Sequence, residues 1–155
     1  MQFLPNRSLT SLFRNGLAAA ALLAASIASA QQMVSVAGKE ANLRAGAGNR
    51  HAVEWSLTKG YPLRVVGRKG NWLQVRDFEN DKGWIYRPLT NSTPHYIVKS
   101  GTANLRGAPA ARGRIVGKLT HGEVLRTLSK RGDWVQVQRE SGTRGWVAKR
   151  LVWGW

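Results

Sequence analysis

The feature that most constrains the fold of this chain is an internal repeat. Gly83-Trp84-Ile85 returns 62 positions later as Gly145-Trp146-Val147. At the same offset, residues 41–89 match residues 103–151 at 17 of 49 positions without a gap, where unrelated sequences would match at roughly three. The chain therefore contains a duplicated unit of about 60 residues, near the lower size limit for a self-standing core. The repeated residues are mainly Gly, Trp and aliphatics, which predict a small β-fold and not an active site.

The first 30 residues have the features of a secretory signal peptide. Arg7 and Arg14 charge a segment without acids, residues 17–25 form an unbroken apolar run, and Ala28-Ser29-Ala30 offers a small-residue cleavage site. The alternative is a retained membrane anchor, but this run is much shorter than the ~18 residues that a spanning helix needs. We expect a periplasmic or secreted protein, cut after Ala30, with no transmembrane span in the mature chain.

Cysteine content and charge narrow the classes of function. The chain has no cysteine, which excludes disulfides, thiol catalysis and a lipidated cysteine at the N-terminus. Without Arg7 and Arg14, the 24 basic residues fall to 22 against 8 acidic ones, a net charge of +14. Such a charge attracts polyanions, for example lipid phosphates, wall polymers or nucleic acid. The alternative is that the charge only keeps the protein soluble.

Strands of four to six residues with Gly at most turns, and no helical periodicity after residue 30, predict an all-β fold. The repeat divides it into a first domain, 31–90, and a second domain, 96–155, with a linker at 91–95. The linker is short, so we expect the domains to lie close together. The terminal Trp153-Gly154-Trp155 could clasp the second domain, contact the first, or extend freely.

Alternation within one hairpin of each copy assigns its side chains to faces. If the aliphatic residues face the core, the tryptophans of the same strands face outward with polar residues. The inward set is Leu73, Val75, Ile85, Val135, Val137 and Val147, and the outward set is Trp72, Gln74, Arg76, Trp84, Tyr86, Trp134, Gln136, Gln138, Trp146 and Ala148. Trp84 and Trp146 are expected to fold over a sheet edge and pack. For Trp72 and Trp134, packing and ligand binding both remain open.

The pattern resembles the bacterial SH3 (SH3b) domain family. Both copies show Asn-Leu-Arg, a Gly/Ala/Pro loop, Gly-x-x-Leu, Gly-x-Trp-x-x-Val, Gly-Trp-aliphatic and a closing Leu. The first copy, with Asn42-Leu43-Arg44-Ala45-Gly46 and Val53-Glu54-Trp55, looks like the tandem SH3-like domains of exported proteobacterial proteins. The second copy departs at Gly107-Ala108 and at Gly117, which replaces Trp55. The resemblance implies two tandem SH3-like small β-barrels, with groove tryptophans at Trp72 and Trp134 and Tyr86 beside a groove.

Catalytic chemistry has little support in the sequence. His51, His95 and His121 do not recur at the repeat offset, and we expect surface histidines. The acidic residues of the loop 77–81 are flanked by Arg76 and Lys82, which favours a solvated hairpin loop over a cation site. We expect no enzyme, no metal and no cofactor. In the family that the chain resembles, wall hydrolases carry their catalytic domain separately.

Binding is the better class, because an outward aromatic ring suits extended peptides or sugar faces. The candidate groove aromatics are Trp55, Trp72, Tyr86 and Trp134. The first copy has more of them, so if only one groove works, we expect it to be the first. The leading prediction is a non-catalytic exported protein that recognises cell-wall (peptidoglycan) peptide or glycan. The alternatives are a periplasmic adaptor that docks another envelope protein, and polyanion binding through the basic loops 68–69 and 130–131, with nucleic acid disfavoured by export.

Overall fold

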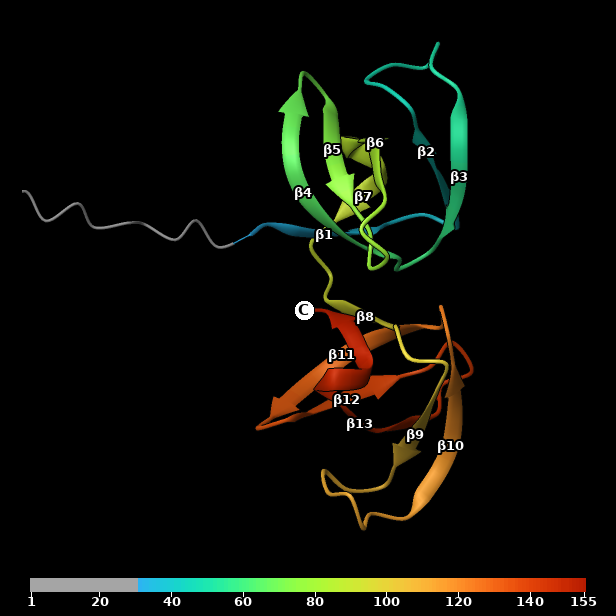
Figure 1. The fold of residues 1–155 in the computed structure, drawn as a ribbon, viewed down its shortest axis with the longest axis vertical. Helices are drawn as coiled ribbons and strands as arrows, with labels where there is room; N and C mark the ends of the chain where they lie inside the picture. Colours follow the sequence, from blue (N-terminus) through green and yellow to red (C-terminus); the bar gives the residue numbers. More distant parts are fainter. Residues whose placement is uncertain (1–30) are drawn as a thin grey trace, which may run out of the picture.

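The computed structural model describes residues 31–155, so the predicted signal peptide lies outside the described residues. These residues form two seven-stranded antiparallel sheets, one for each copy of the repeat (Figure 1). This confirms the prediction of an all-β fold with two similar halves. Within residues 31–155, no helix has the length and apolar character needed to cross a membrane.

The same strand order is used in both domains. The first sheet runs β3-β2-β6-β5-β4-β1-β7 and the second runs β10-β9-β13-β12-β11-β8-β14. The first domain consists of β1 (Met33–Val36), β2 (Glu40–Arg44), β3 (Val53–Thr58), β4 (Pro62–Lys69), β5 (Trp72–Arg76), β6 (Lys82–Tyr86), the 3₁₀ helix η1 (Arg87–Leu89) and β7 (Thr90–Asn91). The second consists of β8 (His95–Val98), β9 (Thr102–Arg106), β10 (Ile115–Thr120), β11 (Val124–Arg131), β12 (Trp134–Gln138), β13 (Arg144–Ala148), η2 (Lys149–Leu151) and β14 (Val152–Gly154).

Each sheet curls around its own apolar core. Every member of the first core has a counterpart 62 positions later in the second, and Val152 is added where the first domain has Thr90. The first core holds Val34, Val36, Ala41, Leu43, Leu57, Leu63, Leu73, Val75 and Ile85, and the second holds Tyr96, Val98, Ala103, Leu105, Leu119, Leu125, Val135, Val137, Val147 and Val152. The inward set predicted from alternation is therefore confirmed. Matching β-bulges in β4 and β11 add the local twist that a curled sheet needs.

The repeated glycine of Gly-Trp has a packing role. A Cβ added at Gly145 would lie 2.6 Å from Cγ of Leu105 and 2.9 Å from the carbonyl oxygen of Arg106. Gly83 lies against Leu43 in the same way. Because these distances are shorter than van der Waals contact, β6 and β13 need glycine to approach β2 and β9.

The two domains are in contact. Residues 92–94 connect β7 to β8, and Asn91 and His95, the ends of the expected linker, already lie in strands. The Ser35 hydroxyl donates to the Thr93 carbonyl at 2.9 Å, and His95 Nδ1 lies 2.9 Å from the same oxygen. Because a carbonyl oxygen only accepts hydrogen bonds, the contact from His95 to Thr93 is a hydrogen bond when Nδ1 carries the ring proton. The ring also covers Gly60 of the first domain, where a Cβ would lie 2.7 Å from it.

The C-terminal segment clasps the second domain and also contacts the first. β14 pairs with β8, the Trp155 amide donates to the His95 carbonyl at 3.2 Å, and the Thr127 hydroxyl donates to the Trp155 carbonyl at 2.8 Å. The Trp153 ring stacks on the Arg64 guanidinium of the first domain, with 5.4 Å between the ring centroid and Arg64 Cζ. Two of the three possibilities left open by the sequence are therefore realised together.

Candidate functional site

A hollow of about 550 Å³ lies beside Trp134 on the second domain. It is formed where β9, the following loop, the β11–β12 turn and η2 meet. Its lining consists of Asn104, Arg106, Ala111, Asp133, Trp134, Ala148, Lys149, Arg150 and Leu151. Trp134 is half-buried, so its indole supplies an apolar wall that a ligand can reach.

The backbone explains why the hollow is open. Trp134 begins β12 and stands directly opposite Ala148, the last residue of β13. The methyl group of Ala148 leaves the space next to the indole unfilled. The Lys149 amide donates to the Asp133 carbonyl at 2.9 Å, which fixes η2 against the β11–β12 turn. Arg106 Nη1 donates to the Gly113 carbonyl at 2.9 Å and holds the opposite wall.

Charge around this hollow is mainly positive. Arg106, Lys149 and Arg150 contribute three cations and Asp133 a single carboxylate. An indole face flanked by cations can bind a flat apolar or sugar surface that carries an acid group nearby. The hollow therefore has the chemistry of a binding site for an anionic peptide or glycan.

The equivalent position in the first domain is filled. Trp72 stands opposite Tyr86 in the β5–β6 register, and their ring centroids lie 5.4 Å apart at 50°. The structure thus brings together two of the predicted groove aromatics, but they pack on each other. The sequence favoured the first domain because it has more aromatics, whereas this hollow lies on the second. In the first domain, Tyr86 occupies the space beside Trp72 that Ala148 leaves open beside Trp134 in the second domain.

Trp55 lies apart from this pair. It sits on the edge strand β3, opposite Leu43, and 55% of its surface is exposed. Among residues 31–155, no ring contact joins it to Trp72 or Tyr86. Trp84 and Trp146 are half-buried, and the Arg131 guanidinium covers Trp146 at 5.6 Å from its centroid.

The acidic loop of the first domain is more ordered than a solvated hairpin loop. Asp77 Oδ1 accepts the amides of Glu79 and Asp81, both at 2.9 Å, and Tyr61 Oη donates to Oδ2 at 3.4 Å. Burial raises the pKa of Asp77 and of Tyr61 above their usual values. Within residues 31–155, no group of three acidic or histidine side chains is arranged to hold a metal ion.

The same two positions carry an ion pair in the second domain. Glu123 and Arg139 stand 62 positions after Tyr61 and Asp77. Arg139 Nε donates to Glu123 Oε1 at 2.6 Å, and both side chains are largely buried. One scaffold therefore accepts a hydroxyl–carboxylate bond or a guanidinium–carboxylate pair at this place.

The histidines differ in environment. His51 and His121 are exposed, as expected, but His95 is half-buried, because it packs between the domains. Burial lowers the pKa of His95. His121 Nε2 lies 3.0 Å from Glu79 Oε1 of the first domain, and this hydrogen bond raises the pKa of His121.

Several residues of the Trp134 hollow were not singled out from the sequence. Arg106, Asp133 and Lys149 are polar residues beside turns, which by themselves read as solvated surface. A signal existed in the repeat: charge is kept at Arg44 and Arg106, and at Arg87 and Lys149. Duplicated charge beside a duplicated tryptophan indicates a common surface.

Comparison with protein families matches both halves of the chain to known domain models. One bacterial SH3 domain model matches residues 37–91, and a second matches residues 101–152. The protein belongs to the bacterial SH3 domain family and contains two such domains in tandem. The resemblance and the two small barrels predicted from the sequence are thereby confirmed.

Similar proteins are longer than this chain. YrvJ of Bacillus subtilis, whose assigned name is that of an N-acetylmuramoyl-L-alanine amidase, is 25% identical over 82% of this chain and 26% of its own length. LytH of Staphylococcus epidermidis, whose assigned name is that of a cell wall amidase, is 33% identical over 39% of this chain and 21% of its own. The chain thus spans about a quarter or less of these relatives.

Similar chains among solved structures are also longer than this one. NlpC1 from Trichomonas vaginalis is 13% identical with a TM-score of 0.37, over 79% of this chain and 45% of that one. An NlpC/P60 family protein from Bacillus cereus is 16% identical with a TM-score of 0.35, over 80% of this chain and 56% of that one.

Proposed function

We propose that this protein is a non-catalytic exported binding protein that recognises cell-wall peptidoglycan, through its peptide or glycan, at the Trp134 hollow. The observation that carries the proposal is the half-buried indole of Trp134 beside an open space of about 550 Å³. The names assigned to two similar proteins, an N-acetylmuramoyl-L-alanine amidase for YrvJ and a cell wall amidase for LytH, support a ligand in the cell wall.

The chemistry of the hollow suits that polymer. Peptidoglycan joins sugar rings, which stack on aromatic faces, to peptides that carry carboxylates. Trp134 would contact the flat surface, and Arg106 and Lys149 would pair with an acid group. Asp133 lies at the turn and gives the site one acceptor for a ligand hydroxyl or amide.

A non-catalytic role is supported for three of the eight acidic residues by the partners that their side chains already have. Asp77 accepts two backbone amides and the Tyr61 hydroxyl, Glu123 pairs with Arg139, and Glu79 pairs with His121. A general base needs an oxygen free to take a proton from substrate. These carboxylates are instead committed to holding loops and domains in place.

Co-sedimentation of the purified protein with peptidoglycan sacculi tests the proposal. At about 0.15 M salt, where long-range attraction is screened, the wild-type protein is expected to sediment with the sacculi. Trp134→Ala removes the apolar wall, and we expect a loss of about 2 kcal/mol, or roughly 30-fold in affinity. Trp55→Ala is the matched control, because it deletes an exposed tryptophan outside the hollow. Equal retention of the two variants would contradict the proposal.

The adaptor alternative has its own observation. The edge strand β3 exposes Val53 at 48% and Trp55 at 55%, and an exposed edge with apolar side chains can accept a strand from another protein. In that case Trp55→Ala abolishes capture of a single envelope polypeptide, and sacculi retain neither variant. Retention that disappears with salt and ignores both tryptophans would instead indicate polyanion binding by the hairpin tips at 68–69 and 130–131. Cell fractionation tests export.

A further inference from the structure

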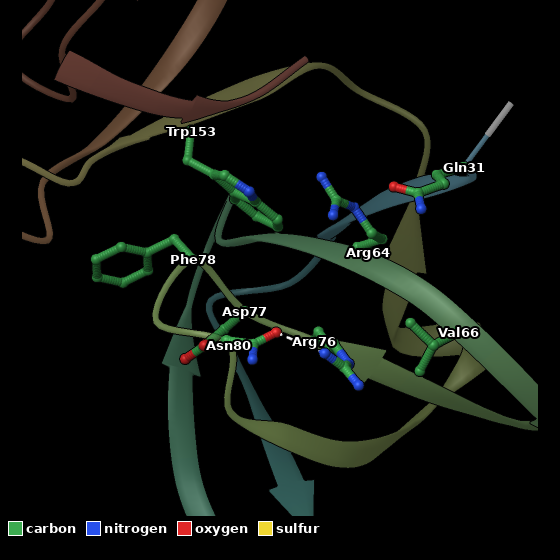
Figure 2. A pocket seen from close by; sticks show the side chains of 8 residues that line it. All are labelled: Gln31, Arg64, Val66, Arg76, Asp77, Phe78, Asn80 and Trp153. Carbon is green, nitrogen blue, oxygen red and sulfur yellow. Dashed lines mark hydrogen bonds between the residues drawn. The ribbon is translucent and has the colours of Figure 1, made fainter. Parts of the chain in front are cut away.

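A second hollow, of about 250 Å³, lies where the first domain meets the C-terminal strand (Figure 2). Its floor comes from β4, β5 and the loop after β5, and Trp153 of β14 covers it. The lining residues are Gln31, Arg64, Val66, Arg76, Asp77, Phe78, Asn80 and Trp153. This hollow is separate from the one beside Trp134.

Two arginines on neighbouring strands line this hollow. Arg64 of β4 and Arg76 of β5 are direct cross-strand partners, so their side chains leave the same face of the sheet. Like charges directly opposite are destabilising in a sheet. Among residues 31–155, neither guanidinium lies within 4.0 Å of a carboxylate. The pair therefore lacks a counter-charge from the described part of the chain.

Arg64 also has an unused donor. Its Nε is buried and has no hydrogen-bond partner among residues 31–155, although buried polar groups are nearly always paired. The Trp153 ring lies over the guanidinium and stabilises the cation, but it offers nothing in the plane of the N–H groups. Arg76 Nη1 donates to Asn80 Oδ1 at 2.7 Å, which accounts for one of its five N–H donors.

Asp77 does not neutralise the pair. Its oxygens accept the amides of Glu79 and Asp81 and the Tyr61 hydroxyl, so they serve the loop. Counting Arg64, Arg76 and Asp77, the lining keeps a positive charge. A ligand for this hollow therefore carries negative charge and in-plane acceptors.

We infer that the hollow is an anion site, in which Arg64 and Arg76 hold the oxygens of one phosphate or carboxylate group beneath Trp153. Both groups present paired oxygens that match the guanidinium fork. The volume suits one such group with a few waters. The inference does not rest on the Trp134 site, and it gives the domain junction a ligand of its own.

The second domain supplies a natural control. The residues that stand 62 positions later, Arg126 and Gln138, are also cross-strand partners, but only one of them is charged. Arg76→Gln therefore gives the first domain a pair that the fold already accepts. Arg144→Gln, at an exposed position of β13, makes the same change in charge away from the hollow.

The test is titration of the purified protein with inorganic phosphate and, separately, with acetate, at ionic strength held constant with sodium chloride. The readouts are the Arg64 Nε–Hε resonance and the Tm. We expect a saturable shift of that resonance and a rise in Tm with at least one of the two anions. Saturation by phosphate alone, by acetate alone or by both assigns the group that binds.

The variants distinguish a specific anion site from non-specific attraction by the positive charge of the protein. Arg76→Gln is expected to weaken binding at least ~10-fold and to keep or raise the Tm without anion, since it removes like-charge repulsion. Arg144→Gln and Trp134→Ala should bind the anion like the wild type, which separates this site from the proposed function. The inference is overturned if neither anion shifts the Arg64 resonance or the Tm more than sodium chloride does. It is also overturned if Arg76→Gln and Arg144→Gln bind the anion with the same affinity. Should Arg76→Gln fail to fold, Arg64→Lys, which keeps the charge but loses Nε, gives the same decision.

Discussion

The two domains share one scaffold but present different surfaces at the same hairpin. The first places Trp72 against Tyr86, with ring centroids 5.4 Å apart. The second places Trp134 against Ala148 and leaves a hollow of about 550 Å³. Both tryptophans are half-buried, so the outward residue opposite each one decides whether a second ring or an open space lies beside it. The two copies keep the same core and differ on the surface of this hairpin.

A second difference lies near the domain junction. The first domain bonds Tyr61 to Asp77, whereas the second pairs Glu123 with Arg139. The loop that starts at Asp77 also reaches the second domain, where the ring centroids of Phe78 and His121 lie 5.3 Å apart. The first domain thus uses this corner to build an interface, and the second uses it for internal stability.

The largest expected effect tests whether the cores are equivalent. Leu43→Ala and Leu105→Ala each remove a leucine that is at most 1% exposed and packs on a glycine. We expect each to lower the free energy of unfolding by about 2–5 kcal/mol, measured by urea denaturation with tryptophan fluorescence. The exposed pair Thr58→Ala and Thr120→Ala is the control. A difference of more than about 2 kcal/mol between the two leucine variants would show that the cores are not equivalent.

The next effect separates the two polar pairs. Arg139→Gln leaves the largely buried Glu123 carboxylate without its charged partner and is expected to cost about 1.5–3 kcal/mol of stability. Tyr61→Phe removes a longer bond of 3.4 Å and should cost less than about 1 kcal/mol. The same denaturation curves measure both. A larger loss of stability for Tyr61→Phe than for Arg139→Gln would contradict the expectation that the ion pair contributes more than the hydroxyl–carboxylate bond.

A smaller effect comes from exchanging the residues that differ at the hairpin. Ala148→Tyr should pack a ring on Trp134, stabilise the protein by about 0.5–1.5 kcal/mol, and abolish retention on peptidoglycan by filling the hollow. Tyr86→Ala should cost a similar amount of stability and open space beside Trp72. Sedimentation and denaturation of each variant report the two results. Wild-type retention of Ala148→Tyr would rule out the hollow as the binding site.

The smallest effect concerns the contact between the domains. The hydrogen bond to Glu79 raises the pKa of His121, so the protonated ring favours the native state. This contribution is present below the unfolded pKa of about 6.5 and is lost as pH rises through the folded pKa. Glu79→Gln should move the pKa of His121 back toward 6.5, as followed by NMR titration. An unchanged pKa would mean that the ion pair does not form in solution.

The sequence predicted the fold and the faces of the hairpin well, because period-two alternation and a second copy constrain both. Leu73, Val75, Val135 and Val137 are buried as expected, and Trp72 meets Tyr86 as the register requires. Alternation says which face a ring lies on, but not whether its neighbour covers it. Which of the two domains binds a ligand therefore stays a prediction.

Contacts between the domains could not be predicted from the repeat. Trp153 lies over Arg64, and Phe78 meets His121, only because the domains dock in one orientation. Trp153, Phe78 and His121 are not repeated at the 62-residue offset, so no pattern linked them to their partners. His95 looked like a surface residue for the same reason.

The way residues 92–94 are held has a consequence for limited digestion. Thr93 receives the Ser35 hydroxyl and gives its amide to the Asn91 side chain at 3.1 Å, and the Pro94 carbonyl accepts the Thr127 amide at 3.1 Å. A protease must draw a free, extended stretch of backbone into its cleft. This joint offers none without first breaking those bonds, so gentle treatment with subtilisin, which has broad specificity, should spare it and cut exposed hairpin tips instead.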